Sequence, residues 1–232
     1  MKTRITIRAK AEDAKFIGTS MGGALVVLKD ALSGEILSRG MIKGSTGNTQ
    51  RIMKTPWARG NRLSDEKTAA FVAELDLDEP RLVEIVVHAP YGQPQALARA
   101  SVTTWVVPGK DILGDGIVID FPGLVVRVCE PPAHTFLKVP ASLTLRVSVT
   151  PMCGCPVDMK TFWPPDAYEV ATYLKKDGQL REILPLSFCQ KTNCFATDLT
   201  LEETGDYEFI VYAYDPKTGN TGVDKTTVVV TK

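Results

Sequence analysis

The sequence predicts an all-β protein of two tandem β-sandwich domains, and three observations support this. Apolar residues recur at every second position in most segments, which is the spacing of a strand with one buried face. Gly, Pro, Asn and Asp separate these segments at short intervals and mark turns. A Pro-Pro pair near the middle of the 232 residues predicts a stiff linker, because proline cannot donate to a sheet ladder.

The expected strands of the first domain are marked by apolar residues that share one face. The clearest sets are Ile5, Ile7 and Ala9; Ala24, Val26 and Leu28; Phe71, Ala73, Leu75 and Leu77; and Val83, Ile85, Val87 and Ala89. Residues 64–73 begin with a weak helix cap at Ser64, so we expect at most a turn or two of helix before the alternation resumes at Phe71.

The second domain shows the same alternation in six further segments. We expect strands B to G over residues 142–150, 168–175, 180–188, 195–201, 206–214 and 223–231. Pro185 predicts that the third of these is an edge strand. The linker Glu130-Pro131-Pro132-Ala133 places the expected domain boundary between residues 1–130 and 131–232.

Two stretches resemble known families of β-sandwich. Residues 203–215, followed by Gly219-Asn220-Thr221-Gly222, resemble the last two strands of bacterial immunoglobulin-like domains, and Tyr207 lies where a tyrosine corner would begin strand F. Residues 23–35, GALVVLKDALSGE, resemble the strand–turn–strand of transthyretin-like or carboxypeptidase-regulatory-like domains. The resemblance implies an immunoglobulin-like second domain, in families whose modules usually serve as spacers, adhesive units or accessory domains.

Charge and motif content argue against several classes of function. The 27 basic residues are balanced by 27 acidic ones, whereas a protein that binds duplex nucleic acid needs a basic surplus. No apolar run approaches the roughly 20 residues of a membrane-spanning helix. No phosphate loop, nucleophile elbow or zinc-protease motif occurs, so we expect no enzyme and no cofactor. Asp111, Asp115 and Asp120 lie among glycines, but apolar residues between them break the spacing of a calcium loop.

Four of the five cysteines are expected at one end of the second domain. Cys153 and Cys155 follow strand B, while Cys189 and Cys194 flank the turn between D and E. Successive antiparallel strands alternate in direction, which brings both connections to the same end, and His134 joins them if it opens strand A. Cys129 stands alone in an expected strand and is predicted to be a buried thiol.

Three interpretations of this cysteine cluster stay open. Two disulfides could staple residues 151–167 to the D–E turn, or could link Cys189 to Cys194 and Cys153 to Cys155. Alternatively, the four thiolates together with His134 would hold zinc or copper. A redox-active Cys-Gly-Cys is the third interpretation. Clustered cysteines in a β-rich chain favour a periplasmic or extracellular protein whose leader is absent from this chain, with the cytoplasm as the alternative.

The long connection over residues 42–68 is a second candidate site. Its basic residues surround Trp57, and Trp57, Arg59 and Arg62 are the predicted binding residues for a partner protein or an anionic glycan. The alternative is that Trp57 folds back over the core. Trp163 forms a similar aromatic candidate beside the cysteines.

The most consistent function is a non-catalytic, secreted or periplasmic protein with a structural or protein-interaction role, such as a subunit of a surface assembly. The partner would be another protein or a second copy, and the alternating strand over residues 3–9 could pair with a neighbour's sheet edge. The alternatives are a metal-binding protein that uses the four cysteines, and a thiol redox or enzyme accessory protein.

Overall fold

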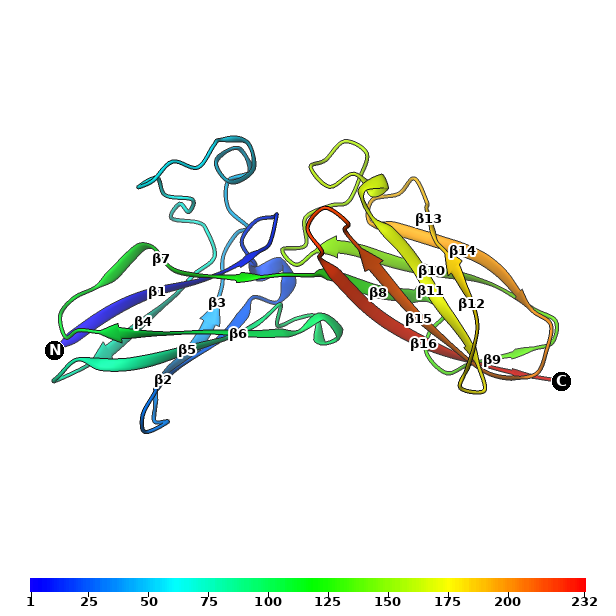
Figure 1. The fold of residues 1–232 in the computed structure, drawn as a ribbon, viewed down its shortest axis with the longest axis horizontal. Coiled ribbons are helices and arrows are strands. Elements are labelled where there is room, and N and C mark those ends of the chain that lie inside the picture. The colour runs from blue at the N-terminus through cyan, green and yellow to red at the C-terminus, as the bar shows by residue number, and fades with distance from the viewer. The chain divides into compact units, whose positions relative to one another are not determined.

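A computed structural model describes residues 1–232, which form two compact units that are described separately below (Figure 1). The first unit comprises residues 1–122 and 152–154, and the second comprises residues 123–151 and 155–232. Both units are built almost entirely of strands, as predicted. The division lies at Pro122, earlier than the predicted boundary after Glu130, because β8 (Leu124–Glu130) pairs with a strand of the second unit.

The first unit is a sandwich of two sheets. One sheet has the order β4-β1-β7 and the other the order β3-β2-β5-β6. The strands are β1 (Lys2–Ala11), β2 (Ala24–Asp30), β3 (Ile36–Ile42), β4 (Phe71–Asp76), β5 (Arg81–Ala89), β6 (Ala98–Val106) and β7 (Ile112–Phe121). The predicted core positions are buried except Phe71, which is half-buried, and Ile5, Ile7, Val26 and Ile85 are fully excluded from solvent.

β1 lies in the middle of its sheet. It pairs antiparallel with β4 on one side and parallel with β7 on the other. Both of its edges are therefore already hydrogen-bonded, and the prediction that residues 3–9 pair with a neighbour's sheet is wrong.

Helix is confined to four short turns. They are Thr19–Met21, Gln50–Lys54, Pro94–Ala96 and Pro165–Ala167. The turn expected after Ser64 is not helical, because the carboxylate of Asp65 accepts the Thr68 hydroxyl and the Lys67 N–H in a tight loop instead. None of these helices is long and apolar enough to cross a membrane.

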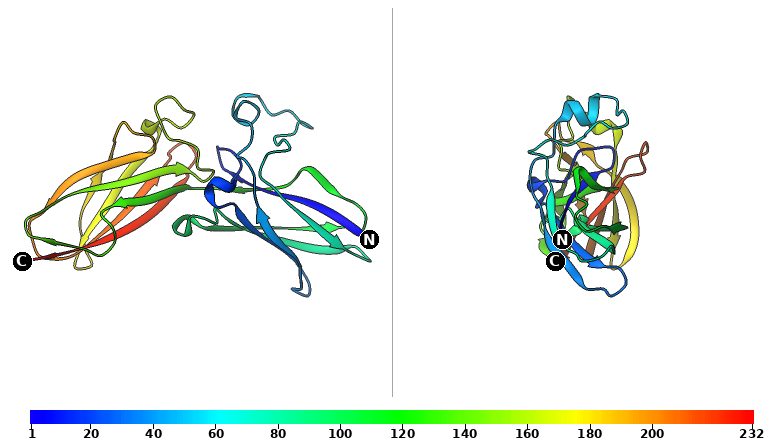
Figure 2. Two further views of the ribbon diagram at one scale, coloured as in Figure 1. Left: turned by 180° about the vertical axis from the view of Figure 1, so that it is seen from behind. Right: turned by 90° about the vertical axis from the view of Figure 1, so that its left-hand side faces the viewer.

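The second unit is an immunoglobulin-like sandwich. Its sheets have the orders β13-β14-β10-β8 and β12-β11-β15-β16-β9, and Figure 2 shows them from behind. This is the D-E-B-A sheet facing the C′-C-F-G sheet of the immunoglobulin fold. Its strands after β8 are β9 (Thr135–Lys138), β10 (Ala141–Pro151), β11 (Glu169–Lys176), β12 (Gln179–Pro185), β13 (Ser187–Phe188), β14 (Cys194–Leu201), β15 (Gly205–Tyr214) and β16 (Thr221–Thr231).

The Pro131-Pro132 pair lies inside the second unit, where the first strand changes sheets. β8 pairs antiparallel with β10, whereas β9 pairs parallel with β16 in the opposite sheet. Since neither proline can donate a backbone hydrogen bond, the chain leaves one ladder at this point and joins the other. The predicted linker is thus the connection between the two halves of strand A.

The segment predicted as strand D also divides between the sheets. β12 forms the edge of the five-stranded sheet, and its last pair with β11 joins Ala171 to Pro185. β13 then pairs with β14 in the other sheet, after Leu186 has turned inward. Pro185 therefore lies on an edge strand, as its missing N–H predicts.

Tyr207 forms the tyrosine corner that the sequence predicts. Its side chain is buried, and its hydroxyl donates to the carbonyl of Glu203 at 2.9 Å. This contact ties the turn before β15 to the strand itself, as in immunoglobulin domains.

We expect Tyr207→Phe to lower the free energy of unfolding of the second unit by about 1 kcal/mol, because the Glu203 carbonyl loses its donor. Hydrogen exchange of β15 peptides across a urea titration measures this loss. Tyr173→Phe is the matched control, since that side chain is 38% exposed. Equal stability of the two variants would contradict a role for the corner hydroxyl.

Candidate functional site

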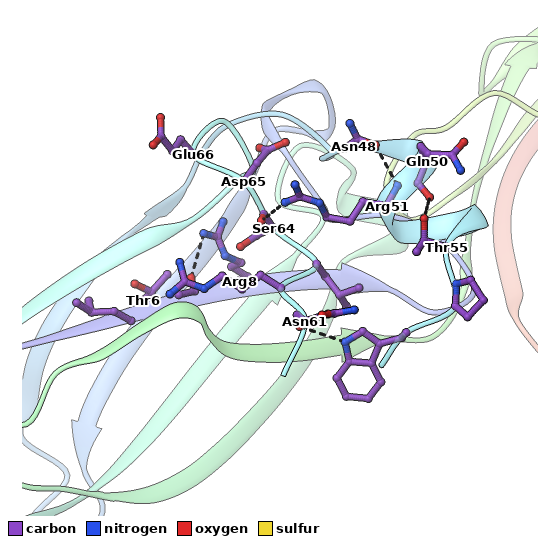
Figure 3. A pocket seen from close by; sticks show the side chains of 16 residues that line it. Thr6, Arg8, Asn48, Gln50, Arg51, Thr55, Asn61, Ser64, Asp65 and Glu66 are labelled. Carbon is purple, nitrogen blue, oxygen red and sulfur yellow. Dashed lines mark hydrogen bonds between the residues drawn. The ribbon is translucent and has the colours of Figure 1, made fainter. Parts of the chain in front are cut away.

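The first unit contains a hollow of about 940 Å³ beside the loop over residues 43–68. Three arginines, Arg8, Arg51 and Arg62, line it together with Trp57. Figure 3 shows Arg8 and Arg51 with the acidic residues Asp65 and Glu66, which also line the hollow. Arg8 comes from β1, and the others come from the loop itself. The hollow therefore forms where the long loop crosses the outer face of the β4-β1-β7 sheet.

Arg8 is a buried cation whose partners are all uncharged. The residue is only 6% exposed, and its Nη1 donates to the carbonyls of Thr68 and Ala69 at 2.6 and 2.8 Å. Nε is buried and has no hydrogen-bond partner. Burial lowers the pKa of Arg8, although the charges of Asp115 and Asp65 act in the opposite direction. A guanidinium nevertheless stays protonated in proteins, so the hollow carries a buried positive charge.

Gly114 of β7 lies between two guanidinium groups. Arg8 Nη2 approaches its carbonyl at 3.5 Å, and a Cβ added at Gly114 would lie 3.3 Å from Arg62 Nε. The residue has a φ of +77°, a conformation that glycine adopts without cost. A side chain at this position would push Arg62 away, so glycine permits Arg62 to lie close to the backbone that accepts a hydrogen bond from Arg8.

Asp115 holds the loop against β7. Its carboxylate accepts the backbone N–H groups of Leu63 and Ser64 at 2.8 and 2.9 Å, and also the Ser64 hydroxyl. Burial alone would raise the pKa of Asp115, but these hydrogen bonds outweigh it and hold the pKa below its ordinary value. Arg51 Nη1 donates to the Ser64 carbonyl at 2.7 Å, which secures the same residue from the other side.

We expect Asp115→Ala to release the loop at a cost of about 2 kcal/mol, because charge-assisted hydrogen bonds are among the stronger ones. The folded-state pKa of Asp115 is depressed, so its stabilisation is present above about pH 4 and is lost as the pH falls through the folded value. The ratio of the amide exchange rates of the variant and the wild type at Leu63 and Ser64 measures the release of the loop. Its dependence on pH shows where the stabilisation by Asp115 is lost.

The control for this experiment is Asp120→Ala. Asp120 lies on β7 like Asp115, but its exposed carboxylate pairs with Lys10 of β1. Its exchange at Leu63 and Ser64 should match the wild type. A ratio near one for Asp115→Ala at neutral pH would show that the loop is held by other contacts.

The predicted loop residues differ in their placement. Trp57 is 70% exposed, and its indole Nε1 donates weakly to the Asn61 carbonyl at 3.4 Å. The alternative that Trp57 folds over the core is therefore wrong. Arg62 lines the hollow, whereas Arg59 is exposed on the loop outside it.

Sequence reasoning missed Arg8 and Asp115 as site residues. Both faces of β1 are buried, since Thr6 and Arg8 are as inaccessible as the core face with Ile5 and Ile7. A charged residue in the first strand of a sandwich would ordinarily face water. No local signal shows that a loop some 40 residues later covers it, so the site could not be found from the pattern.

The connection after β10, which contains Cys153 and Cys155, meets the β13–β14 turn that Cys189 and Cys194 flank. Asn193 of this turn joins the two. Its N–H donates to the Val157 carbonyl at 2.9 Å, and its side-chain oxygen accepts the Val157 N–H at 2.7 Å. Its own carbonyl accepts the Val149 N–H at 2.8 Å. Backbone and amide groups of the D–E turn therefore hold the connection after β10.

The four predicted sulfurs do not form one cluster. Cys153 groups with the first unit, whereas Cys155, Cys189 and Cys194 belong to the second. No disulfide is formed, and no three His, Cys, Asp or Glu side chains are placed to share a metal ion. His134 donates its N–H to Thr227, about 20 Å along β16 from the F–G connection. The predicted zinc or copper site over these residues thus has no matching geometry.

Two further expectations are reversed by local packing. Cys129 is exposed, because a register shift between β8 and β10 at Arg146 and Val147 inserts it as an extra residue and breaks the alternation. Trp163 is only 7% exposed and forms a bridge with Val157, so it is a packing residue of its loop and not an aromatic binding tip.

The chain resembles tandem β-sandwich structures only distantly. The fibronectin(III)-like modules of CbhA from Clostridium thermocellum align over 99% of this chain and 94% of theirs, with 10% identity and a TM-score of 0.32. The titin domains z1z2 in complex with telethonin align over 99% and 94%, with 12% identity and a TM-score of 0.27. An engineered protein aligns over 51% of this chain and 22% of its own length, with 18% identity and a TM-score of 0.36.

At TM-scores this low the similarities carry no argument, and the immunoglobulin-like assignment rests on the strand order and the tyrosine corner. No family model matches the chain. No curated protein matches it either.

Proposed function

We propose that this chain is a non-catalytic protein of two β-sandwich domains that binds a partner protein through the arginine-lined hollow of its first unit. The partner presents an acidic side chain or a chain terminus to Arg8 and Arg62, and an apolar residue to Trp57. The second unit acts as an immunoglobulin-like spacer or accessory domain. The strand–turn–strand over residues 23–35 of the first unit resembles that of transthyretin-like domains.

The buried Arg8 with its unpartnered Nε carries this proposal. A buried charge is costly unless an opposite charge or a full set of hydrogen bonds compensates it. Within the chain, Arg8 donates only to carbonyl oxygens. Asp115 and Asp65 act on Arg8 by charge, without a hydrogen bond to it. A carboxylate from a partner would add an opposite charge that binds the guanidinium directly, and arginine is the residue best suited to bind it with two N–H groups.

The exposed indole beside the arginines supports a protein partner. Trp and Arg are the residue types that dominate the binding energy of protein interfaces. No histidine or cysteine lines the hollow, and its one serine, Ser64, donates its hydroxyl to Asp115. The nucleophile–base pair of a hydrolase is therefore not assembled there.

A capture experiment from the source cells with three baits tests the proposal. The wild-type chain is compared with Trp57→Ala/Arg62→Ala and with the control Trp105→Ala/Arg99→Ala, which removes the same residue types from exposed positions on β6. We expect one or more proteins to bind the wild type and the β6 control. Recovery of these proteins with the loop variant should be at least tenfold lower, and acetate should displace them from the wild type.

Equal recovery with both double variants would overturn the proposal. A captured partner that resides outside the cytoplasm would in addition support the proposed periplasmic or extracellular location of this chain.

A further inference from the structure

Three cysteines form a row across the outer face of the β13-β14-β10-β8 sheet. Cys194 pairs with Ser148 of β10. The side chains of this pair point to the opposite face of the sheet from those of the next pair, Phe195 and Val147, which face the core. Cys189 extends the β13–β14 ladder beyond the pair of Phe188 and Phe195, so it lies directly across from Cys194. Its N–H donates to the Cys194 carbonyl at 2.9 Å.

Cys129 lies at the other end of this row. Its thiol donates to the Arg127 carbonyl at 3.6 Å, and burial together with the neighbouring Cys194 thiol raises the pKa of Cys129. Cys129 is nevertheless two strands away from Cys194, because β10 runs between β8 and β14. Strands lie about 4.8 Å apart, which puts the two Cα atoms about 9–10 Å from each other.

Cys189 and Cys194 have the spacing of a disulfide across the ladder, whereas Cys129 does not. Residues directly opposite in an antiparallel ladder have Cα atoms about 4.5–5.5 Å apart, within the range that disulfides span, whereas Cα atoms beyond about 7 Å cannot be bridged without backbone movement. The Cys189 thiol donates to the Ser187 carbonyl at 4.0 Å, and the Cys194 thiol is near enough to contribute to the raised pKa of Cys189. Cys129 is too far across the sheet from Cys194.

We propose that Cys189 and Cys194 are a dithiol that a low-molecular-weight disulfide oxidises to a cross-strand disulfide, while Cys129 remains a thiol. The Cys189 thiolate attacks one sulfur of the oxidant and releases one thiol, which leaves a mixed disulfide on Cys189. The Cys194 thiolate then attacks the Cys189 sulfur and releases the second thiol. The pair loses two electrons and two protons, and the oxidant's S–S bond is reduced to two thiols.

The disulfide would close the turn over residues 190–193, which contains Asn193. Because Asn193 holds both Val149 and Val157, oxidation fixes the turn that anchors the connection after β10. Burial, together with the neighbouring Cys194 thiol, raises the pKa of Cys189 to about 11. Little thiolate is present at neutral pH, so the pair is a slow structural switch and not a thiol catalyst.

Mass spectrometry of the full chain tests the proposal directly. The reduced protein is treated with oxidised glutathione, alkylated, unfolded and digested with trypsin, which cleaves after Lys191 between the two cysteines. We expect residues 182–191 and 192–217 to be recovered as one linked species that has lost two hydrogens, with Cys129 alkylated. The rate of linkage should rise about tenfold per pH unit between pH 8 and 10, as the thiolate fraction rises.

Two variants sharpen the result. Cys194→Ser should trap a glutathione adduct on Cys189, and Cys129→Ser should leave the linked species unchanged. Linkage of Cys189 to the peptide with Cys129, or to the one with Cys153 and Cys155, would overturn the pairing. Full alkylation of both Cys189 and Cys194 after treatment at pH 10 would overturn the switch itself.

Discussion

Gly116→Ala should destabilise the first unit by about 3 kcal/mol or more, one of the two largest effects expected of a single substitution in this chain. Gly116 lies in β7 with a φ of +69°, where a residue with a side chain is strained. A Cβ at this position would also lie only 2.1 Å from the backbone oxygen of Thr6. A backbone atom cannot rotate away as a side chain can, so the strands themselves must separate.

The separation would occur in the parallel ladder between β1 and β7. Its register shifts between Ile5 and Ile7, and Gly116 occupies this irregular step immediately before the pair of Ile7 and Ile117. Since the core face of β1 and the position of Gly114 beside Arg8 depend on this ladder, we expect the hollow to be lost together with the local stability.

Gly109→Ala is a closely matched control. Gly109 has the same φ of +69°, but a Cβ there would meet only the sulfur of Met1 at 3.8 Å. Its expected cost is therefore the conformational strain alone, about 1 kcal/mol. Hydrogen exchange of β1 and β7 peptides across a urea titration measures both variants, and a difference below 1 kcal/mol between them would mean that the close approach of the strands is unimportant.

The strands were predictable because their signal is local. A period of two in apolar residues is a property of a single strand, so Ile5, Ile7 and Ala9 or Val147 and Val149 predict a buried face without knowledge of any partner. Sheet membership depends on distant pairing. β8 reads as a strand from its own residues, but only its ladder with β10 shows that it belongs to the second unit.

The candidate site divides in the same way. Trp57 and Arg62 were predicted because Arg and Trp in a long loop are a local feature, and the structure leaves both accessible. Arg8 was missed because its role depends on the loop that covers β1. Trp163 was misinterpreted for the same physical reason, since its burial depends on the bridge with Val157 and not on the residues beside it.

Arg8→Met should lower the stability of the first unit by about 2–3 kcal/mol and abolish the response of the hollow to carboxylates. Two opposing terms decide the sign. Removal of the guanidinium relieves the cost of a buried charge, which favours the variant. It also leaves the carbonyls of Thr68 and Ala69 without the Nη1 donor, at about 1–3 kcal/mol each if they stay dry.

We expect the second term to win, because the two Nη1 hydrogen bonds are short and the guanidinium lies 5.9 Å from the centroid of the Phe16 ring. Arg8→Lys keeps a cation that can donate to a carbonyl but not the planar fork, so its stability should fall between those of the wild type and Arg8→Met.

An acetate titration followed by the Nε–H signals of the arginines separates folding from binding. In the wild type, saturable shifts of the Arg8 and Arg62 signals are expected, while the exposed Arg99 should be unaffected. Arg8→Met should abolish the shift at Arg62 as well, because the two guanidinium groups both lie beside Gly114. If Arg8→Met were as stable as the wild type and Arg62 still responded to acetate, the buried cation would be neither a stabilising element nor the centre of the site.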